Sequence, residues 1–168
     1  MEVLYIFFWV VWAAAIALIF AYSFVLLFGA PYFPSLDPHV KVAFKLLDLK
    51  KGQTVYDLGC GDGRFLRAAA QRGIKAVGYE LNPFMFVWAW LATRRYRHLV
   101  SVRLGNFWKA DISQADAVFV FLLTKFMKRL DDKLAAEGKK GLKVASHAFK
   151  IPGKKPLAKE YGVFLYKY

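Results

Sequence analysis

The chain has few residues that form disulfides or bind metals. Its 168 residues include one cysteine, Cys60, so no disulfide can form within the chain, and a reducing compartment is expected. The three histidines, His39, His98 and His147, do not have the spacing of metal ligands, and no cysteine–histidine cluster accompanies them. The sequence therefore predicts no metal site. Internal repeats and low-complexity segments are also absent, which excludes a repeat architecture.

Residues 3–28 contain no charge, no proline and no glycine. As a helix they would be about 39 Å long, which exceeds the roughly 30 Å hydrocarbon core of a bilayer. A buried core helix of this length would need more protein around it, and a signal peptide would have a basic start and a shorter apolar stretch. A transmembrane anchor is therefore predicted. Ala13, Ala17 and Ala21 share one face of it, which either permits packing against a partner helix or reflects the abundance of alanine in such helices.

Charge is distributed very unevenly along the chain. Residues 1–34 hold one charged residue, Glu2, whereas residues 35–168 hold all 25 lysines and arginines and 11 acidic residues, a net charge of 25 − 11 = +14. The positive-inside rule then places the N-terminus outside and the globular part in the cytoplasm, as at a prokaryotic plasma membrane. Basic residues near an anionic lipid surface gain about 1 kcal/mol each. The lipid bilayer is the favoured partner, and nucleic acid is the rival explanation for this charge.

The chain is divided into three parts: an anchor (3–28), a proline-rich elbow (29–38) and a globular domain (39–168). Within the domain, expected strands at 54–60, 76–81, 100–104, 117–123 and 142–149 alternate with helices at 64–72, 83–97 and 125–137. This alternation predicts an α/β fold with a parallel, Rossmann-like sheet. Only 19 residues follow Phe149, enough for an antiparallel strand at 163–168 and a loop. The sheet is therefore expected to have about six strands, with a trimmed C-terminus.

The most informative motif is TVYDLGCGDG at 54–63, in which Gly59, Gly61 and Gly63 follow an apolar strand at alternate positions. A dinucleotide fingerprint would place a further glycine at position 64, where this chain has Arg64. The spacing acidic-x-Gly-x-Gly-x-Gly instead resembles motif I of class I S-adenosylmethionine (SAM) methyltransferases. A plain glycine-rich turn is the alternative.

Acidic and amide residues lie near or just after the carboxyl ends of the first three expected strands. Doubly wound sheets bind their ligands at these ends. Free N–H groups at the start of the helix that follows the turn would meet the carboxylate of the methionine part of SAM. Asp57 would lie near its amino group, or order or cap the turn. Glu80 would accept both ribose hydroxyls, or lie at the surface as a strand-end residue. Asn106 would accept from the adenine amino group beside Phe107, or form a polar turn next to a packing aromatic residue.

Methyl transfer to an amine depends on positioning and on a deprotonated nucleophile. A lysine, with a reference pKa near 10.4, loses its proton more readily in a low-dielectric pocket, and aromatic walls attract its cationic form. Tyr32, Phe33, Trp108 and Phe121 are the candidate walls, and each can equally be a packing residue. The segment VFVFLLTKF at 118–126 lacks the Asn/Asp-Pro-Pro-aromatic tetrapeptide of enzymes that methylate amino groups of adenine, cytosine or glutamine. This absence argues against a nucleic-acid substrate.

Taken together, these motifs resemble the small membrane-anchored seven-β-strand lysine methyltransferases, whose mitochondrial members modify the adenine nucleotide translocase and the ATP synthase c-subunit. The shared segments are the membrane helix, GAPYFP (29–34), VYDLGCGDGR (55–64), GYELNP (78–83), FWK (107–109), LDDKL (130–134), SHAFKIP (146–152) and the terminal aromatic strand. Asn106 replaces the aspartate expected before the FWK segment, and mitochondrial presequence features are missing.

The resemblance implies protein-lysine methylation with SAM, and S-adenosylhomocysteine as product, at or in a membrane. It assigns cofactor positions at Asp57, Gly59, Gly61, Gly63, Glu80 and Asn82, and the neighbouring Cys60, Leu81, Asn106 and Phe107 complete the expected site. Two other hypotheses stay open. The chain could methylate a lipophilic small molecule, such as a quinone or a lipid headgroup, or it could be a non-catalytic SAM-binding adaptor that recruits a partner through Ala13, Ala17 and Ala21.

Overall fold

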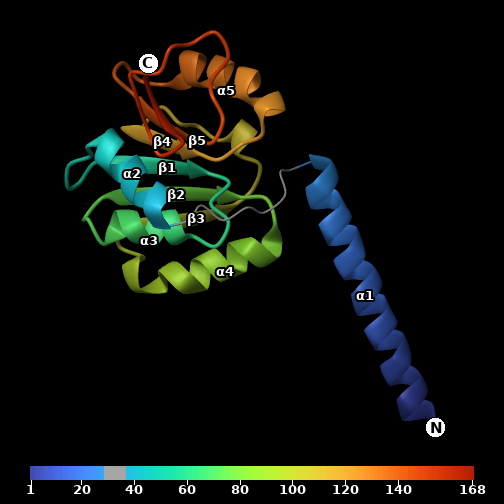
Figure 1. The fold of residues 1–168 in the computed structure, drawn as a ribbon. Helices are drawn as coiled ribbons and strands as arrows, with labels where there is room; N and C mark the ends of the chain where they lie inside the picture. Colours follow the sequence, from blue (N-terminus) through green and yellow to red (C-terminus); the bar gives the residue numbers. More distant parts are fainter. Residues whose placement is uncertain (29–36) are drawn as a thin grey trace. The chain divides into compact units, whose positions relative to one another are not determined.

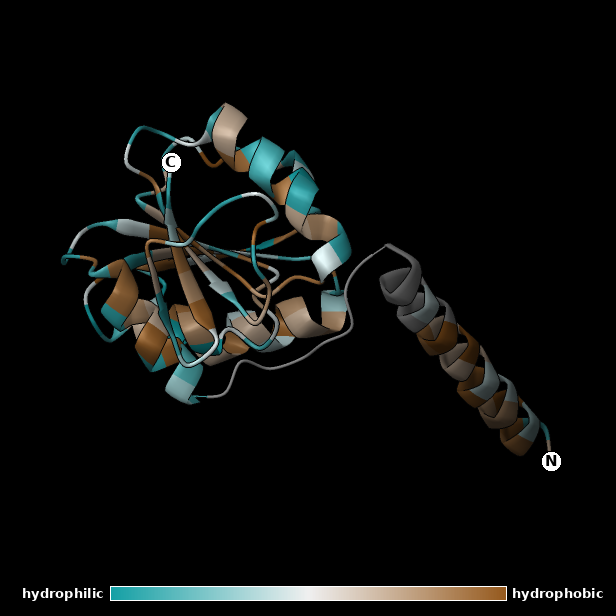
Figure 2. Cartoon of the chain, turned by 45° about the horizontal axis from the view of Figure 1, so that its top comes forward, coloured by the Kyte–Doolittle hydropathy of each residue, from teal (hydrophilic) through white to brown (hydrophobic). Residues whose placement is uncertain are grey.

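The computed structural model describes residues 1–28 and 37–168, which form parts of two compact units, Met1–Tyr32 and Phe33–Tyr168. The first unit contains helix α1 (Glu2–Phe28). Its segment Glu2–Ile19 has a mean hydropathy of 2.2 and no buried share, so by length and composition it could cross a membrane. Figure 2 shows that much of this helix is hydrophobic. Most of the predicted elbow, including Tyr32 and Phe33, lies outside the described residues.

The second unit is a three-layer α/β domain (Figure 1). Its elements in chain order are α2 (Asp37–Leu47), β1 (Thr54–Leu58), α3 (Arg64–Ala70), β2 (Lys75–Glu80), α4 (Pro83–Thr93), η1 (Arg94–Tyr96), β3 (Val100–Leu104), η2 (Phe107–Lys109), β4 (Ala117–Val120), α5 (Thr124–Glu137), β5 (Lys143–His147), β6 (Ala158–Glu160) and β7 (Val163–Lys167). The predicted alternation of strands and helices is confirmed, and several predicted elements end two or three residues earlier in the structure.

The strands form one seven-stranded sheet in the order β3-β2-β1-β4-β5-β7-β6. The first five are parallel, and β7 is antiparallel to both of its neighbours. The predicted antiparallel terminal strand is confirmed, whereas the prediction of about six strands is wrong. The missed strand, β6, has only three residues, and none of them is buried. Without a buried side chain such a short strand carries no alternation of apolar and polar residues.

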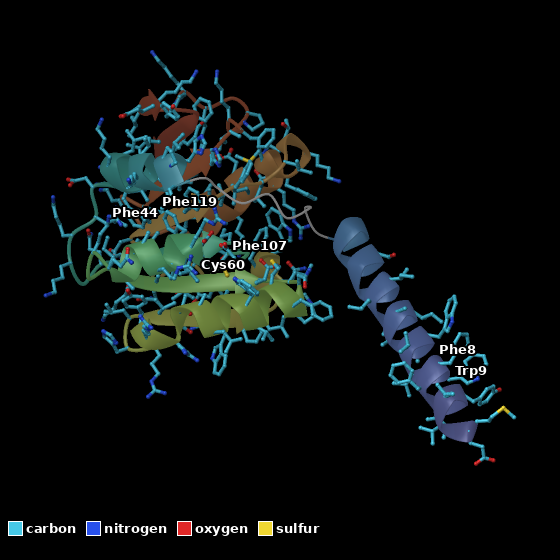
Figure 3. The ribbon with its side chains drawn as sticks, turned by 60° about the horizontal axis from the view of Figure 1, so that its bottom comes forward. Phe8, Trp9, Phe44, Cys60, Phe107 and Phe119 are labelled. Carbon is cyan, nitrogen blue, oxygen red and sulfur yellow. The ribbon has the colours of Figure 1, made fainter. Side chains whose placement is uncertain are left out.

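The side chains of alternate strand residues enter two cores, one on each face of the sheet. On one face α2 and α3 contribute to a stack in which the Phe65 ring lies 4.6 Å from Phe44 and 4.1 Å from Phe119. Phe44 and Phe119 are labelled in Figure 3. On the other face α5 buries Met127, Leu130 and Leu134. Because both faces of β1 and β4 are covered, their carboxyl ends are held in fixed positions.

The register of the central strands aligns the ends that matter for ligand binding. Leu58 of β1 pairs with Val120 of β4, and Val120 pairs with Ser146 of β5. The residues that follow these three positions therefore leave the sheet at one edge. Strand order reverses between β1 and β4, because the chain continues from β1 to β2 and β3 on one side and to β4 and β5 on the other. Such switch points are where open parallel sheets bind ligands.

Candidate active site

The glycine-rich turn occupies this switch point, directly after β1. Gly59 and Gly61 have φ values of 97° and 52°, in the left-handed region that glycine adopts without strain. A Cβ atom added at Gly59 would meet no other atom within 4 Å, so open space lies beside the turn. Gly63 has a different role, since a Cβ there would approach the Cβ of Ala89 to 3.1 Å. It lets the beginning of α3 pack closely against α4.

The backbone amides of this turn are bonded within the protein. The N–H groups of Gly59 and Cys60 both donate to the Tyr79 carbonyl at 2.9 Å, and the Gly61 N–H donates to Glu80 Oε2 at 2.8 Å. These three amides of the turn therefore already have partners within the protein. These bonds fix the turn against β2 and prepare its shape before any ligand binds.

Asp57 lies at the end of β1 with 3% of its surface exposed. Burial, with the nearby carboxylates of Glu80 and Asp62, raises the pKa of Asp57 well above its usual value. Among residues 1–28 and 37–168 no group is seen to donate a hydrogen bond to its side chain. A buried carboxylate in a negative environment is costly unless a cation or donor reaches it. The group is therefore suited to an ammonium ligand.

Glu80 joins the two segments that border the turn. Its Oε2 accepts from Gly61 N–H, and its Oε1 accepts from the N–H of Asn82 at 2.9 Å. Each carboxylate oxygen can accept a second hydrogen bond, so two acceptor positions remain for ligand hydroxyls. The glutamate is thus held in one orientation by the protein, in the place where a ribose is expected.

The other predicted cofactor residues have clear local roles. Asn82 caps α4, because its Oδ1 accepts from Phe84 N–H at 2.9 Å, and Leu81 lies between it and Glu80. Asn106 caps η2 in the same way, through Trp108 N–H at 3.0 Å. Its side-chain NH₂ group can still donate to an adenine ring nitrogen.

Cys60 is a packing residue. A Cβ atom added at Gly78 would come within 2.8 Å of its sulfur, so the thiol fills the space that Gly78 leaves. Burial, followed by the charges of Asp57 and Glu80, raises the pKa of the Cys60 thiol well above its usual value. A thiol in this state is a poor nucleophile. Cys60 therefore packs against Gly78 and shapes the turn.

The aromatic candidates separate into two groups. Trp108 packs toward α5, with the Arg129 guanidinium 4.3 Å from its ring and Phe126 at 6.2 Å, and Phe107 lies 4.6 Å away. Phe121 follows β4 and lies 4.3 Å from the ring of His147. Among the described residues, the ring contacts of Trp108 and Phe121 are thus with different partners.

Two residues with clear structural roles were not predicted. Lys133, in the LDDKL segment, is buried on α5 and donates to the Ala110 carbonyl at 2.6 Å and to Glu137 Oε2 at 2.6 Å. It ties the η2 segment to α5. His147, at the end of β5, lies with its ring 4.2 Å from that of His39. The SHAFKIP segment contains His147, but nothing in the sequence pairs it with His39.

These features fit S-adenosylmethionine better than a dinucleotide. The buried Asp57 suits its ammonium group, Glu80 suits the ribose, and Gly105, whose added Cβ would meet nothing within 4 Å, leaves space next to Asn106. A pyrophosphate would instead place negative charge beside Asp57 and Glu80, which like-charge repulsion opposes.

Comparisons with known proteins agree with a SAM site. The family described as the ANTKMT methyltransferase domain matches residues 57–158. A protein-lysine N-methyltransferase of Saccharolobus islandicus is 38% identical over 130 residues, which cover 75% of this chain and 81% of that protein. The adenine nucleotide translocase lysine N-methyltransferase of Mus musculus is 37% identical, over 76% of this chain and 57% of its own length.

A lysine N-methyltransferase of the ATP synthase c-subunit, from Xenopus laevis, is 35% identical, over 73% of this chain and 54% of its own length, so this chain spans little more than half of the vertebrate relatives. Among solved structures, an RNA methyltransferase of Salinibacter ruber in complex with S-adenosylhomocysteine has a TM-score of 0.74 and 31% identity, over 81% of this chain and 92% of its own. A SAM-dependent methyltransferase of Geobacter sulfurreducens, at a TM-score of 0.60 and 17% identity over 80% of this chain and 58% of its own, shares the fold.

Proposed function

Because the chain belongs to the family of ANTKMT methyltransferase domains and is a SAM-dependent protein-lysine N-methyltransferase, we propose that it works at a membrane and methylates a lysine of a membrane-associated protein. The observation that carries the chemistry is the glycine turn at the switch point, with Asp57 and Glu80 beside it. The methyl donor is SAM, and the second product is S-adenosylhomocysteine.

The residues divide the binding task among them. Asp57 holds the ammonium group of the methionine part, Glu80 the ribose hydroxyls, and Asn106 and Phe107 the adenine. When bound, SAM supplies a methyl group on a positively charged sulfur. The lone pair of the lysine Nε forms the new N–C bond while the electrons of the C–S bond remain on sulfur, so the positive charge passes from sulfur to nitrogen. The protein contributes orientation and exclusion of water.

Two features of the chain support a membrane location. Helix α1 is long and apolar enough to cross a bilayer, and the rest of the chain carries a net charge of +14 (25 − 11), which an anionic surface attracts. Helix α4 adds an apolar surface, because Phe84, Trp88 and Trp90 are 55%, 61% and 56% exposed. Arg94 and Arg95 follow directly. Aromatic residues beside arginines suit the lipid headgroup region.

The same features lead to the proposed topology and partners. The charge asymmetry favours an N-terminus outside and a catalytic domain in the cytoplasm of a prokaryotic cell. A domain held at this surface meets lysines that lie near the headgroups of its membrane-protein substrate. Ala13 and Ala17 are exposed on α1 and would permit close packing of a partner helix, whereas the side chain of Ala21, the third residue of the predicted stripe, lies outside the described part.

Labelling separates the proposed substrate from the alternatives. Membranes that contain the protein would be incubated with SAM labelled in its methyl group, and label would be measured in the protein and lipid fractions. We expect label in a protein lysine, and its loss with Glu80→Ala. Label confined to lipid or quinone would favour small-molecule methylation. No label in either fraction would favour a non-catalytic adaptor.

Liposome flotation tests the surface of α4. The Phe33–Tyr168 segment is a compact unit with cores on both faces of its sheet, so we expect it to fold without α1. We expect it to float with anionic vesicles and to lose most of this binding in the double variant Trp88→Ser/Trp90→Ser. Leu157→Ser is the control, since Leu157 is 67% exposed but lies outside α4. Equal flotation of all three proteins would contradict a role for α4.

A further inference from the structure

Two histidines from distant parts of the sequence form a pair at the carboxyl end of β5. His39 belongs to α2 and His147 ends β5, and their ring centroids are 4.2 Å apart with an interplanar angle of 32°. Phe121 lies on one side, 4.3 Å from His147, and Tyr161 on the other, 5.8 Å from His39. The four rings come from four different segments of the domain, so this cluster is a product of the tertiary fold.

The cluster lies beside the proposed SAM site. Leu58, Val120 and Ser146 are aligned in register across β1, β4 and β5, and Phe121 and His147 follow the last two. The glycine turn follows the first of them. Neighbouring strands are about 4.8 Å apart, which places the end of β5 roughly 10 Å from the end of β1. β4 and β5 are adjacent in Figure 1. A methyl donor at the turn and an acceptor at the histidine pair would therefore be neighbours.

The pair contains a polar atom that needs a partner. His39 Nδ1 is buried and makes no hydrogen bond within the part of the chain that the structure describes. Buried polar atoms of native proteins nearly always have a hydrogen-bond partner, and exceptions are found at sites that bind ligands. Burial, and secondarily the neighbouring His39, lowers the pKa of His147 to about 4, so this imidazole is uncharged at neutral pH. A ligand that donates a hydrogen bond would satisfy His39 Nδ1.

We propose that His39, His147 and Phe121 form the acceptor side of the active site, where the two imidazoles bind the side-chain amine of the lysine that receives the methyl group. This assignment rests on the proposed function, and it names the residues that contact the second substrate.

Imidazoles suit this amine better than carboxylates do. A carboxylate within about 4–6 Å would stabilise the ammonium form and raise the pKa of the lysine, so the amine would keep its proton. An uncharged imidazole accepts one N–H hydrogen bond and leaves the nitrogen lone pair free to point at the methyl group. The ring face of Phe121 attracts the cation on arrival. The proton leaves for solvent before transfer, since a ring with a pKa of about 4 does not retain it.

The test uses a probe that spans both sides of the site. In this analogue of S-adenosylhomocysteine the sulfur is replaced by a nitrogen that carries a two-carbon amine arm, which keeps the terminal amine close to the position of the transferred methyl group. Calorimetry on the full chain in detergent would compare its Kd with that of S-adenosylhomocysteine. We expect the wild type to bind the probe about tenfold or more tightly than S-adenosylhomocysteine, a difference of about 1.4 kcal/mol. We expect His39→Phe and His147→Phe to lose this gain while their Kd for S-adenosylhomocysteine changes less than about twofold.

Matched variants distinguish loss of contact from loss of structure. His98→Phe is the control, because His98 is exposed in the segment before β3, and it should keep the full gain. His39→Asn can place an amide near the position of Nδ1 and should keep part of it. As a second measurement, ring ¹⁵N resonances of His39 and His147, but not of His98, should shift when the probe is added.

Four results would overturn the assignment. A full gain in both phenylalanine variants, or unshifted resonances of His39 and His147 with the probe bound, would place the acceptor elsewhere. If the wild type binds the probe no more tightly than S-adenosylhomocysteine, the acceptor also lies elsewhere, and the SAM site is unaffected. Failure of the wild type to bind S-adenosylhomocysteine would contradict the proposed function itself, and the acceptor assignment with it.

Discussion

The two halves of the proposed active site are built from opposite kinds of groups. On the donor side the buried carboxylate of Asp57 and the half-buried carboxylate of Glu80 lie beside the glycine turn, and backbone N–H groups hold Glu80 in place. On the acceptor side the rings of His39, His147 and Phe121 pack together. Negative charge favours the ammonium group and the cationic sulfur of SAM. Uncharged rings allow a lysine to lose its proton. The proposed site would therefore bind the cationic SAM at the carboxyl end of β1 and favour deprotonation of the lysine at the carboxyl end of β5.

The largest effect is expected from filling the donor side. Gly61→Arg places a long side chain at a residue with a φ of 52°, beside Glu80. We expect S-adenosylhomocysteine to bind at least about 100-fold more weakly, a loss of about 2.8 kcal/mol, and methyl transfer to stop. Gly153→Arg is the matched control, since Gly153 has a φ of 73° and open space around it. If both variants lose binding equally, backbone strain is the cause and the donor assignment fails.

Asp57→Asn tests the charge of the donor side. Removing one partner of a charge-assisted hydrogen bond costs about 1.5–3 kcal/mol, so S-adenosylhomocysteine should bind about tenfold or more weakly. The unfolding free energy should rise at neutral pH, because a buried carboxyl group with a raised pKa is replaced by a neutral amide. Calorimetry and urea unfolding measure the two effects. A variant that binds normally would show that Asp57 only orders the turn.

The two halves should also differ in the sign of their pH dependence. His147 has a pKa of about 4 in the folded chain and about 6.5 when unfolded, so its contribution to stability is present above pH 6.5 and is lost as pH falls toward 4. The pKa of Asp57 is raised, so its contribution is lost as pH rises above 3.8.

The difference between wild type and His147→Phe isolates the histidine. Between pH 6.5 and 4.5 the variant should lose less unfolding free energy than the wild type, by about 2 kcal/mol, as expected for a shift of this size. The groups nearest the pair, His39 of α2 and Tyr161 of the β6–β7 turn, are unchanged in the variant. Parallel profiles, measured by urea unfolding at each pH, would mean that protonation of His147 is not coupled to folding.

A smaller effect is expected from releasing the η2 segment. Lys133→Met removes the bonds to Ala110 and Glu137 and should lower the unfolding free energy by about 2 kcal/mol. Because η2 contributes Phe107 to the donor side, binding of S-adenosylhomocysteine should weaken about two- to threefold, or about 0.5 kcal/mol. Lys128→Met is the control on the same helix, since the Lys128–Asp132 pair is exposed and such pairs contribute little. Similar stability losses in the two variants would remove any special role for Lys133.

The donor side could be predicted from the sequence because its signals are local. Asp57 and the three glycines lie within seven residues, and Glu80 ends the next strand, so strand order alone brings them together. The acceptor pair could not be predicted, because His39 and His147 meet only when α2 packs beside β5. The position of Trp108 could not be predicted for the same reason, since its contacts with Arg129 and Phe126 depend on where α5 lies.

A crystal structure with bound S-adenosylhomocysteine tests the division into donor and acceptor sides most directly. We expect the ammonium group to lie at Asp57, the ribose hydroxyls to bond to Glu80, and the sulfur to point toward Phe121 and His147. A ligand bound away from the glycine turn, or a sulfur that faces away from the ends of β4 and β5, would contradict it.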